Sequence, residues 1–216
     1  FRGSALRMQG LEPEHTLILI NGQRAIGRVD GVLDLSRFQV EDIDRIEILK
    51  GAGSALYGSD AIAGVINIIT RTPQKPLSAE LRTTYGSLNA LDVSARLGAV
   101  ANYWNVRASG GFHSSDAWDL DPSDPATTSS AFRTYNADFS SDIDISSDSS
   151  LSANVQYTQR RQDGLDATTN GALLDRRNFL RTINASLAST TDINERLRLF
   201  FKIGHAYLLD QFEQDQ

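Results

Sequence analysis

The sequence predicts two consecutive regions of different fold class: a mixed α+β region over residues 1–76, and antiparallel strands of a transmembrane β-barrel over residues 77–216. Three observations lead to this division. The hydrophobic pattern changes at a linker marked by Pro73 and Pro76. After the linker, apolar and polar residues alternate with a period of two, which is the period of a strand with two different faces. The connections between the alternating stretches are short and long by turns, as in bacterial outer-membrane barrels.

The first region contains short β-rich stretches separated by turn signals. Residues 16–21 (TLILIN) form an apolar run that ends in Asn21-Gly22, a dipeptide that favours a tight turn with positive φ. Residues 44–50 and 61–70 are rich in isoleucine and valine and are expected to form strands. A short helical turn is expected over residues 40–44. These stretches together predict a small α+β arrangement.

Seven stretches of the second region alternate apolar and polar residues, and each is expected to form a strand. They are residues 78–85, 91–97, 104–112, 135–145, 151–157, 179–187 and 197–203. Short connections are expected near 100–102, 146–150 and 192–195, and longer ones over 114–130 and 162–177; the first hairpin turn, residues 86–89, is short although it lies on the long side. A soluble β-sandwich would show the same alternation and is the alternative fold.

In a membrane barrel, the two residue sets of each strand should face opposite environments. The residues expected to face lipid are Leu81, Leu91, Val93, Leu97, Val106, Phe112, Tyr135, Phe139, Val155, Tyr157, Ile183, Leu187, Leu199 and Phe201. The residues expected to face the lumen are Glu80, Arg82, Asp92, Arg96, Arg107, Asp138, Asn154 and Asn184.

Composition excludes several classes of function. The formal net charge of −6 and the isoelectric point near 5.0 argue against a nucleic-acid partner, because a phosphate-binding face needs clustered lysine and arginine. Cysteine is absent, so neither a disulfide framework nor a thiolate metal site is expected. No apolar run approaches the ~18 residues of a membrane-spanning helix.

The stretch from residue 16 to residue 71 resembles the C-terminal half of the plug domain of TonB-dependent outer-membrane receptors. The order and spacing of its motifs are most similar to those of the vitamin B12 and siderophore receptors. The motif residues are TLILINGQR followed by DLSRFQVEDIDRIEILKGAGSALYGSDAIAGVINIITR. Residues 1–3 (FRG) resemble the family's "IRG" segment. Ala52 stands where the family usually has proline.

The resemblance implies that the chain is a fragment: residues 1–76 would be the C-terminal half of a plug, and residues 77–216 the first seven or so strands of a barrel of about 22. It implies a location in the bacterial outer membrane and active uptake of a scarce nutrient, such as a ferric siderophore, haem or cobalamin. The partners would be TonB with its inner-membrane energising complex, outer-membrane lipid, and a small ligand that is a metal chelate or resembles cobalamin. A signalling or surface-binding receptor is the alternative within the same family.

The resemblance also suggests two groups of site residues on the plug. Family plugs are held by charge pairing between two plug arginines and barrel glutamates, and these positions fall on Arg2 and Lys50; the lysine keeps the charge but lacks the bidentate guanidinium. An apical loop follows the Asn-Gly turn in family plugs. Here that loop contains Arg24, Ile26 and Arg28, which could meet an anionic chelate, or could simply pair with lumen carboxylates.

The first long connection of the second region contains an acidic cluster. Its members are Asp116, Asp119, Asp121 and Asp124. Calcium binds several carboxylate and carbonyl oxygens at close range, so a calcium site in this loop is one interpretation. A solvated acidic loop without a metal is the other. No other cofactor is expected.

Two enzymatic interpretations fail on the residues themselves. The Gly51-x-Gly53 pattern after a strand would need a third glycine at position 56 to bind a dinucleotide, and that position is Leu56. The histidines, His15, His113 and His205, have no nucleophile-elbow pattern near them. The sequence therefore predicts a protein that is not an enzyme.

Overall fold

The structure is a computed structural model that describes residues 6–25, 28–29, 32–33, 43–51, 57–120, 123, 126–167 and 172–215. The chain divides into two compact units, residues 1–72 and 73–216. No helix in these described ranges is long and apolar enough to cross a membrane.

The first unit is built on a small mixed sheet. Its strands are β1 (Thr16–Ile20), β2 (Gln23–Arg24), β5 (Ile43–Lys50) and β6 (Gly64–Thr70), in the order β2-β1-β6-β5. β1 and β6 lie parallel at the centre, while β2 and β5 are antiparallel to their neighbours. A separate pair, β3 (Arg28–Val29) and β4 (Val32–Leu33), is antiparallel. The expected strands over 16–21, 44–50 and 61–70 are thus present.

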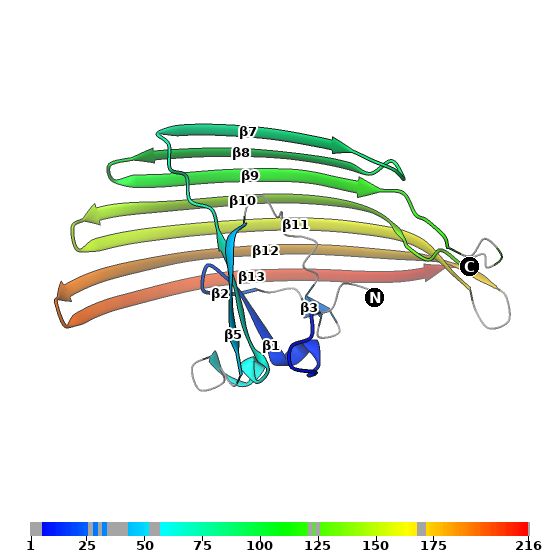
Figure 1. The fold of residues 1–216 in the computed structure, drawn as a ribbon, viewed down its shortest axis with the longest axis horizontal. Coiled ribbons are helices and arrows are strands. Elements are labelled where there is room, and N and C mark those ends of the chain that lie inside the picture. Colours follow the sequence, from blue (N-terminus) through cyan, green and yellow to red (C-terminus); the bar gives the residue numbers. More distant parts are fainter. Residues whose placement is uncertain are drawn as a thin grey trace. The chain divides into compact units, whose positions relative to one another are not determined.

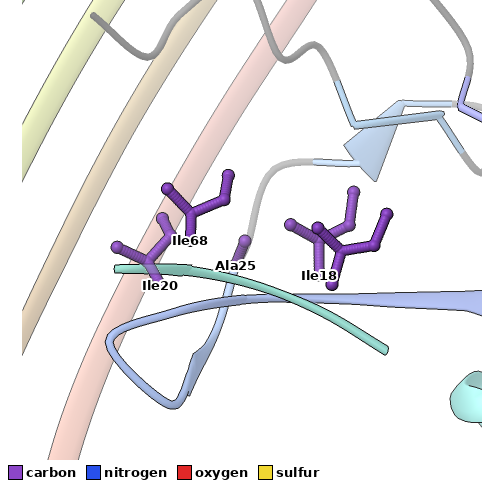
Figure 2. Close-up of a cluster of buried hydrophobic side chains, with 5 residues drawn as sticks. Ile18, Ile20, Ala25 and Ile68 are labelled. Atoms are coloured by element: carbon purple, nitrogen blue, oxygen red, sulfur yellow. The ribbon is translucent and has the colours of Figure 1, made fainter. Parts of the chain in front are cut away.

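The two central strands are buried on both faces because apolar side chains alternate toward each side. Ile18 and Ile20 of β1 pack with Ile66 and Ile68 of β6 and with Ala25. Figure 2 shows the side chains of Ile18, Ile20, Ala25 and Ile68 in this cluster. The opposite face of the same strands packs its own cluster, which consists of Leu17, Leu19, Ala61 and Val65. These two clusters are the core of the first unit.

The described part of the first unit contains less helix than the α+β prediction implies. Over the described residues, helix in this unit is limited to the 3-10 turns η1 (Pro13–His15) and η4 (Ser59–Ala61) and to the helical residue Tyr57. Of the helical turn expected over residues 40–44, Ile43 and Asp44 are instead in β5, and residues 40–42 lie outside the described part. The pairing of Ile43 with Thr70 accounts for the difference, because a ladder contact outweighs a weak local helix preference.

The second unit is one antiparallel sheet in which each strand pairs with the next in sequence. Figure 1 shows these strands side by side, with the short turns at one end. Over the described residues the strands are β7 (Leu77–Tyr85), β8 (Leu91–Ala101), β9 (Trp104–Ser115), β10 (Ala131–Ser146), β11 (Ser149–Ala167), β12 (Leu173–Asn194) and β13 (Leu197–Asp215). Each of the seven stretches predicted from alternation lies within or largely within one of them.

The register of these strands separates the two residue sets expected from the sequence. Directly opposed residues of an antiparallel pair lie on the same face. Val93 pairs with Phe112, and Phe112 with Tyr135; on the other face, Asp92 pairs with His113. Continued across the sheet, the pairing puts every residue expected to face lipid on one face and every residue expected in the lumen on the other.

The exposed fractions agree with this separation. This is clearest on β10, where Tyr135 and Phe139 on the apolar face are 46% and 43% exposed, whereas Thr134 and Asn136 on the polar face are 4% and 6% exposed. An exposed apolar face opposite a partly buried polar one is the reverse of a soluble sandwich and is the arrangement of a membrane barrel wall. The two faces are called the outer face and the inner face below.

One predicted connection is wrong. A long loop was expected over residues 162–177, but β11 and β12 continue as a paired ladder up to Ala167 and Leu173, so only residues 168–172 connect them. Residues of this extension are polar on both faces of the strand, so the apolar–polar alternation that predicts a strand is missing there. The other long connection, residues 116–130, and the short turns at 102–103, 147–148 and 195–196 agree with the prediction.

Candidate functional site

The turn between β1 and β2 fixes the start of the apical segment of the first unit. Asn21 and Gly22 both have positive φ, +49° and +75°, which suits a two-residue hairpin turn. The side-chain oxygen of Asn21 accepts a hydrogen bond from the backbone N–H of Thr70 at 2.9 Å. The N–H of Gly22 donates to Oδ1 of Asn67 at 2.9 Å. The turn predicted from Asn21-Gly22 is therefore anchored to β6 at two points.

Asn67 of β6 extends these hydrogen bonds to the edge strand β5. Its Nδ2 donates to Oε2 of Glu47 at 3.1 Å, and the other oxygen of Glu47 accepts from Nε of Arg45 at 3.0 Å. The hydrogen bond from Arg45 to Glu47, together with one to Asp44, raises the pKa of Arg45, so this guanidinium stays charged. An amide within an apolar strand is costly unless both of its groups are satisfied, and here both are.

The apical residues predicted to meet a ligand are described to different extents. Arg24 lies in β2, is exposed, and forms an ion pair with Asp60 of η4. Ala25, the next residue, is buried in the core and so ties the segment down. Ile26 lies outside the described residues, and Arg28 is described only as backbone of β3. Arg24 is thus a surface cation that its ion pair with Asp60 orients and partly neutralises.

The two positions predicted to pair with the barrel are also unequal. Arg2 lies outside the described residues. Lys50 is the last residue of β5, is exposed, and pairs in the ladder with Gly64. Its role in charge pairing stays a prediction.

The acidic loop is partly described. Asp116 accepts a hydrogen bond at Oδ2 from Nδ2 of Asn89 at 2.5 Å, and Asn89 accepts one from the hydroxyl of Tyr85 at 2.7 Å. Oδ1 of Asp119 accepts from the hydroxyl of Thr128 at 2.8 Å. Each carboxylate therefore already has at least one protein donor, and Asp119 lies within a loop that the bridge between Trp118 and Ser129 closes.

Two members of the acidic cluster, Asp121 and Asp124, lie outside the described residues. Among the residues that the structure does describe, no group of three or more His, Cys, Asp or Glu is arranged to hold a metal ion. The calcium site stays a prediction.

Three features of the site were not predicted from the sequence. They are the Arg24–Asp60 pair, the Asn67–Glu47–Arg45 chain, and a link between His113 and Asp92, whose Nδ1 and Oδ1 are 2.5 Å apart. Each joins residues that only register or folding brings together. No local spacing in the sequence signals them.

The first 65 residues match a known domain family. Residues 1–65 match the family model described as TonB-dependent Receptor Plug Domain. Residues 1–65 therefore belong to the plug-domain family of TonB-dependent receptors. A vitamin B12 transporter, BtuB of Vibrio vulnificus (strain CMCP6), is 34% identical over 121 residues, which are 56% of this chain and 20% of that protein. The chain thus spans about a fifth of the length of this relative.

Solved structures resemble nearly the whole of the chain. The siderophore receptor PiuA from Acinetobacter baumannii matches 97% of this chain and 31% of its own, with a TM-score of 0.67 and 13% identity. The copper transporter OprC matches 99% of this chain and 42% of its own, with a TM-score of 0.59 and 15% identity. At these identities the likeness shows the fold.

The plug-domain match and the receptors that the chain resembles place it in the bacterial outer membrane. The relatives are receptors and transporters, so the family is not one of enzymes. In a barrel wall of this kind the outer face of the second unit would be the lipid face, and the rim with residues 116–130 would be the extracellular one, because long connections lie outside in such barrels.

Proposed function

We propose that the receptor containing this chain imports a scarce nutrient across the outer membrane by TonB-dependent transport. The observation that carries the proposal is a plug-family unit followed directly by a sheet with an apolar outer face and a polar inner face. In this proposal residues 1–76 are the C-terminal half of the plug, and residues 77–216 are the first strands of a barrel of about 22 strands.

The proposed ligand is an anionic metal chelate or a cobalamin-like molecule. The named ligands of the relatives, vitamin B12, siderophores and copper, all involve a metal. Arg24, Ile26 and Arg28 would form the ligand-facing part of the apical segment. Two arginines and one apolar side chain suit a chelate that presents both carboxylate or catecholate oxygens and carbon surface.

Energy for transport would come from TonB and its inner-membrane complex pulling on the plug. Arg2 and Lys50 would pair with barrel carboxylates and hold the plug until that pull. The single ammonium of Lys50 would make its half of the pairing weaker than a guanidinium fork. Calcium held by Asp116, Asp119, Asp121 and Asp124 would order the outer loop.

The ligand proposal is tested with Arg24→Ala together with Arg28→Ala in the full-length receptor. Ligand affinity should fall by about a hundredfold or more, since each of the two charge-assisted contacts contributes about 1.5–3 kcal/mol. Equilibrium binding of the transported chelate is the measurement. Asp60→Asn is the matched control: it removes the partner of Arg24 but keeps the arginine, and should preserve binding. Unchanged affinity in the double variant would assign the segment to plug scaffolding only.

The calcium proposal is tested with Asp119→Asn together with Asp121→Asn. The wild-type receptor should bind ligand more weakly after chelation of calcium, and the double variant should lose this dependence. Isothermal titration with calcium is the direct measurement. Asp148→Asn with Asp192→Asn, at the opposite rim, is the control. Equal affinity of the wild-type receptor with and without chelator would reject the metal.

A further inference from the structure

Three arginines gather on the outer face of the second unit, near the extracellular rim. Arg133 of β10 is directly opposite Arg161 of β11. Arg181 of β12 is opposite Gln159, the neighbour of Arg161 on the same face of β11, and so lies closer to the middle of the sheet. These residues are called the outer arginine cluster. Their face is fixed by register, because Arg181 is opposite Gln159 and Gln159 is opposite Tyr135, which belongs to the lipid-facing set.

The height of the cluster follows from the length of the strands. On β10 the outer face runs from Ile143, opposite Trp104 next to a short turn, to Tyr135. That is about nine residues, the length of a strand that crosses the hydrocarbon of a bilayer. Tyr135, Tyr157 and Tyr207 are aromatic residues of the kind that mark the interface. Arg133 and Arg161 occupy the next outward positions and therefore lie at the level of the lipid headgroups.

The residues that the structure describes neutralise the cluster only in part. Arg133 makes no ion pair with any residue the structure describes. Arg161 binds Asp163 through Nε, at 3.1 and 3.0 Å from the two carboxylate oxygens, which leaves its terminal nitrogens. Arg181 donates to the neutral Oε1 of Gln159 at 3.1 Å and lies over the ring of Phe179 at 5.1 Å. Among the described residues these three guanidinium groups thus make one ion pair, between Arg161 and Asp163, while the carboxylates farther out on the same face, Asp175 and Asp215, contact Arg177 instead.

Such an arrangement is unfavourable unless an anion joins it. Like charges directly opposite each other on a sheet destabilise it, and the Cβ atoms of such a pair are only about 5 Å apart. Arg181 is held in place by Gln159, which also accepts from the hydroxyl of Tyr157 at 2.8 Å. A fixed guanidinium next to an opposed arginine pair matches the geometry of a phosphate, which accepts paired N–H donors.

We propose that the outer arginine cluster binds a phosphate-bearing lipid of the outer leaflet. The lipid phosphate would lie between Arg133 and Arg161, with Arg181 beneath it, and the acyl chains would run along the apolar outer face between β10 and β12. This role concerns the lipid side of the wall. It is independent of the nutrient ligand and of TonB.

The experiment uses detergent-solubilised full-length receptor, titrated with a fluorescent bis-phosphorylated glycolipid. Arg133→Gln together with Arg161→Gln should weaken binding by about tenfold to thirtyfold, the size expected for two arginines near an anionic lipid surface. Arg82→Gln with Arg198→Gln removes the same charge from the inner face and the opposite rim, and should leave binding unchanged. The single variant Arg133→Gln, which disturbs no pair, should show a smaller loss.

Two further probes separate the lipid from its phosphate. The dephosphorylated glycolipid should bind weakly to wild type and variants alike, and inorganic phosphate at millimolar concentration should not displace the phosphorylated lipid. Equal loss in the control pair, undiminished binding in both cluster variants, or equal binding of the dephosphorylated lipid would each overturn the proposal. Because no nutrient or energy source is used, the outcome does not depend on the transport proposal.

Discussion

At the scale of single residues, Gly64 shows why a family motif has glycine at one position. Its φ is +148°, a conformation available almost only to glycine. A Cβ on Gly64 would come within 2.4 Å of the carbonyl oxygen of Leu49 and 2.5 Å of the sulfur of Met8. The motif residue thus permits β6 to lie against β5, and the sheet that holds the apical turn depends on it.

Gly64→Ala should therefore destabilise the β5–β6 ladder by about 3 kcal/mol or more, since backbone strain and a clash with fixed backbone add. Gly10→Ala is the matched control, because Gly10 also has positive φ, +74°, but its Cβ would meet nothing within 4 Å. The control should cost about 1 kcal/mol. Hydrogen exchange of peptides from β5 and β6 in the full-length receptor measures both. Equal protection in the two variants would contradict the steric explanation.

At the scale of elements, each strand of the second unit separates one environment from another. Phe139 on the outer face pairs with Val155, while the neighbouring Asp138 on the inner face pairs with Gln156. A shift of register by one residue would exchange the two sets, so the lipid-facing pattern specifies the register.

Spin labels should report this separation directly. Labels at Val93, Phe139 and Val155 in the receptor in bilayers should collide more with oxygen than with a water-soluble nickel complex, because oxygen concentrates in hydrocarbon. Labels at the adjacent Asp92, Asp138 and Asn154 should show the opposite preference. Continuous-wave power saturation gives both values. Adjacent positions with the same accessibility would contradict the assignment of the faces.

The elements could be predicted from the sequence to the extent that their signals are local. Alternation located the strands of the second unit, and the Asn21-Gly22 dipeptide located the turn. The extension of β11 and β12 was missed because residues such as Arg160, Arg161 and Gln162 are polar on both faces, which leaves no period to detect.

The site was predicted less well, for the same physical reason. Arg24 pairs with Asp60, which is distant in the sequence, and Asn67 with Glu47 only because β5 and β6 align in one register. The opposed arginines Arg133 and Arg161 likewise become a pair only when β10 meets β11. Contacts across strands depend on register, and the register of a pair cannot be predicted from the sequence of one strand alone.

At the scale of the whole molecule, the sheet of the second unit presents two edges. Over the described residues β7 and β13 each pair with a single neighbour. An unpaired strand edge leaves backbone N–H and C=O groups without partners, and in lipid each such group costs several kcal/mol. A wall of this kind is stable in a bilayer only when further strands close it, which agrees with the proposed barrel of about 22 strands.

Residues 73–216 expressed alone should consequently aggregate or fail to insert into bilayers. The cause would be the open edges together with the exposed apolar face, which includes Leu81 on β7 and Phe201 and Ile203 on β13. Size-exclusion chromatography in detergent, with a gel test for heat-resistant folded protein, provides the measurement, and the full-length receptor is the control. A monodisperse, heat-resistant monomer of the isolated unit would mean that β7 and β13 find partners within the unit itself. In that case the unit would be a small closed barrel, and the proposed 22-stranded architecture would be wrong.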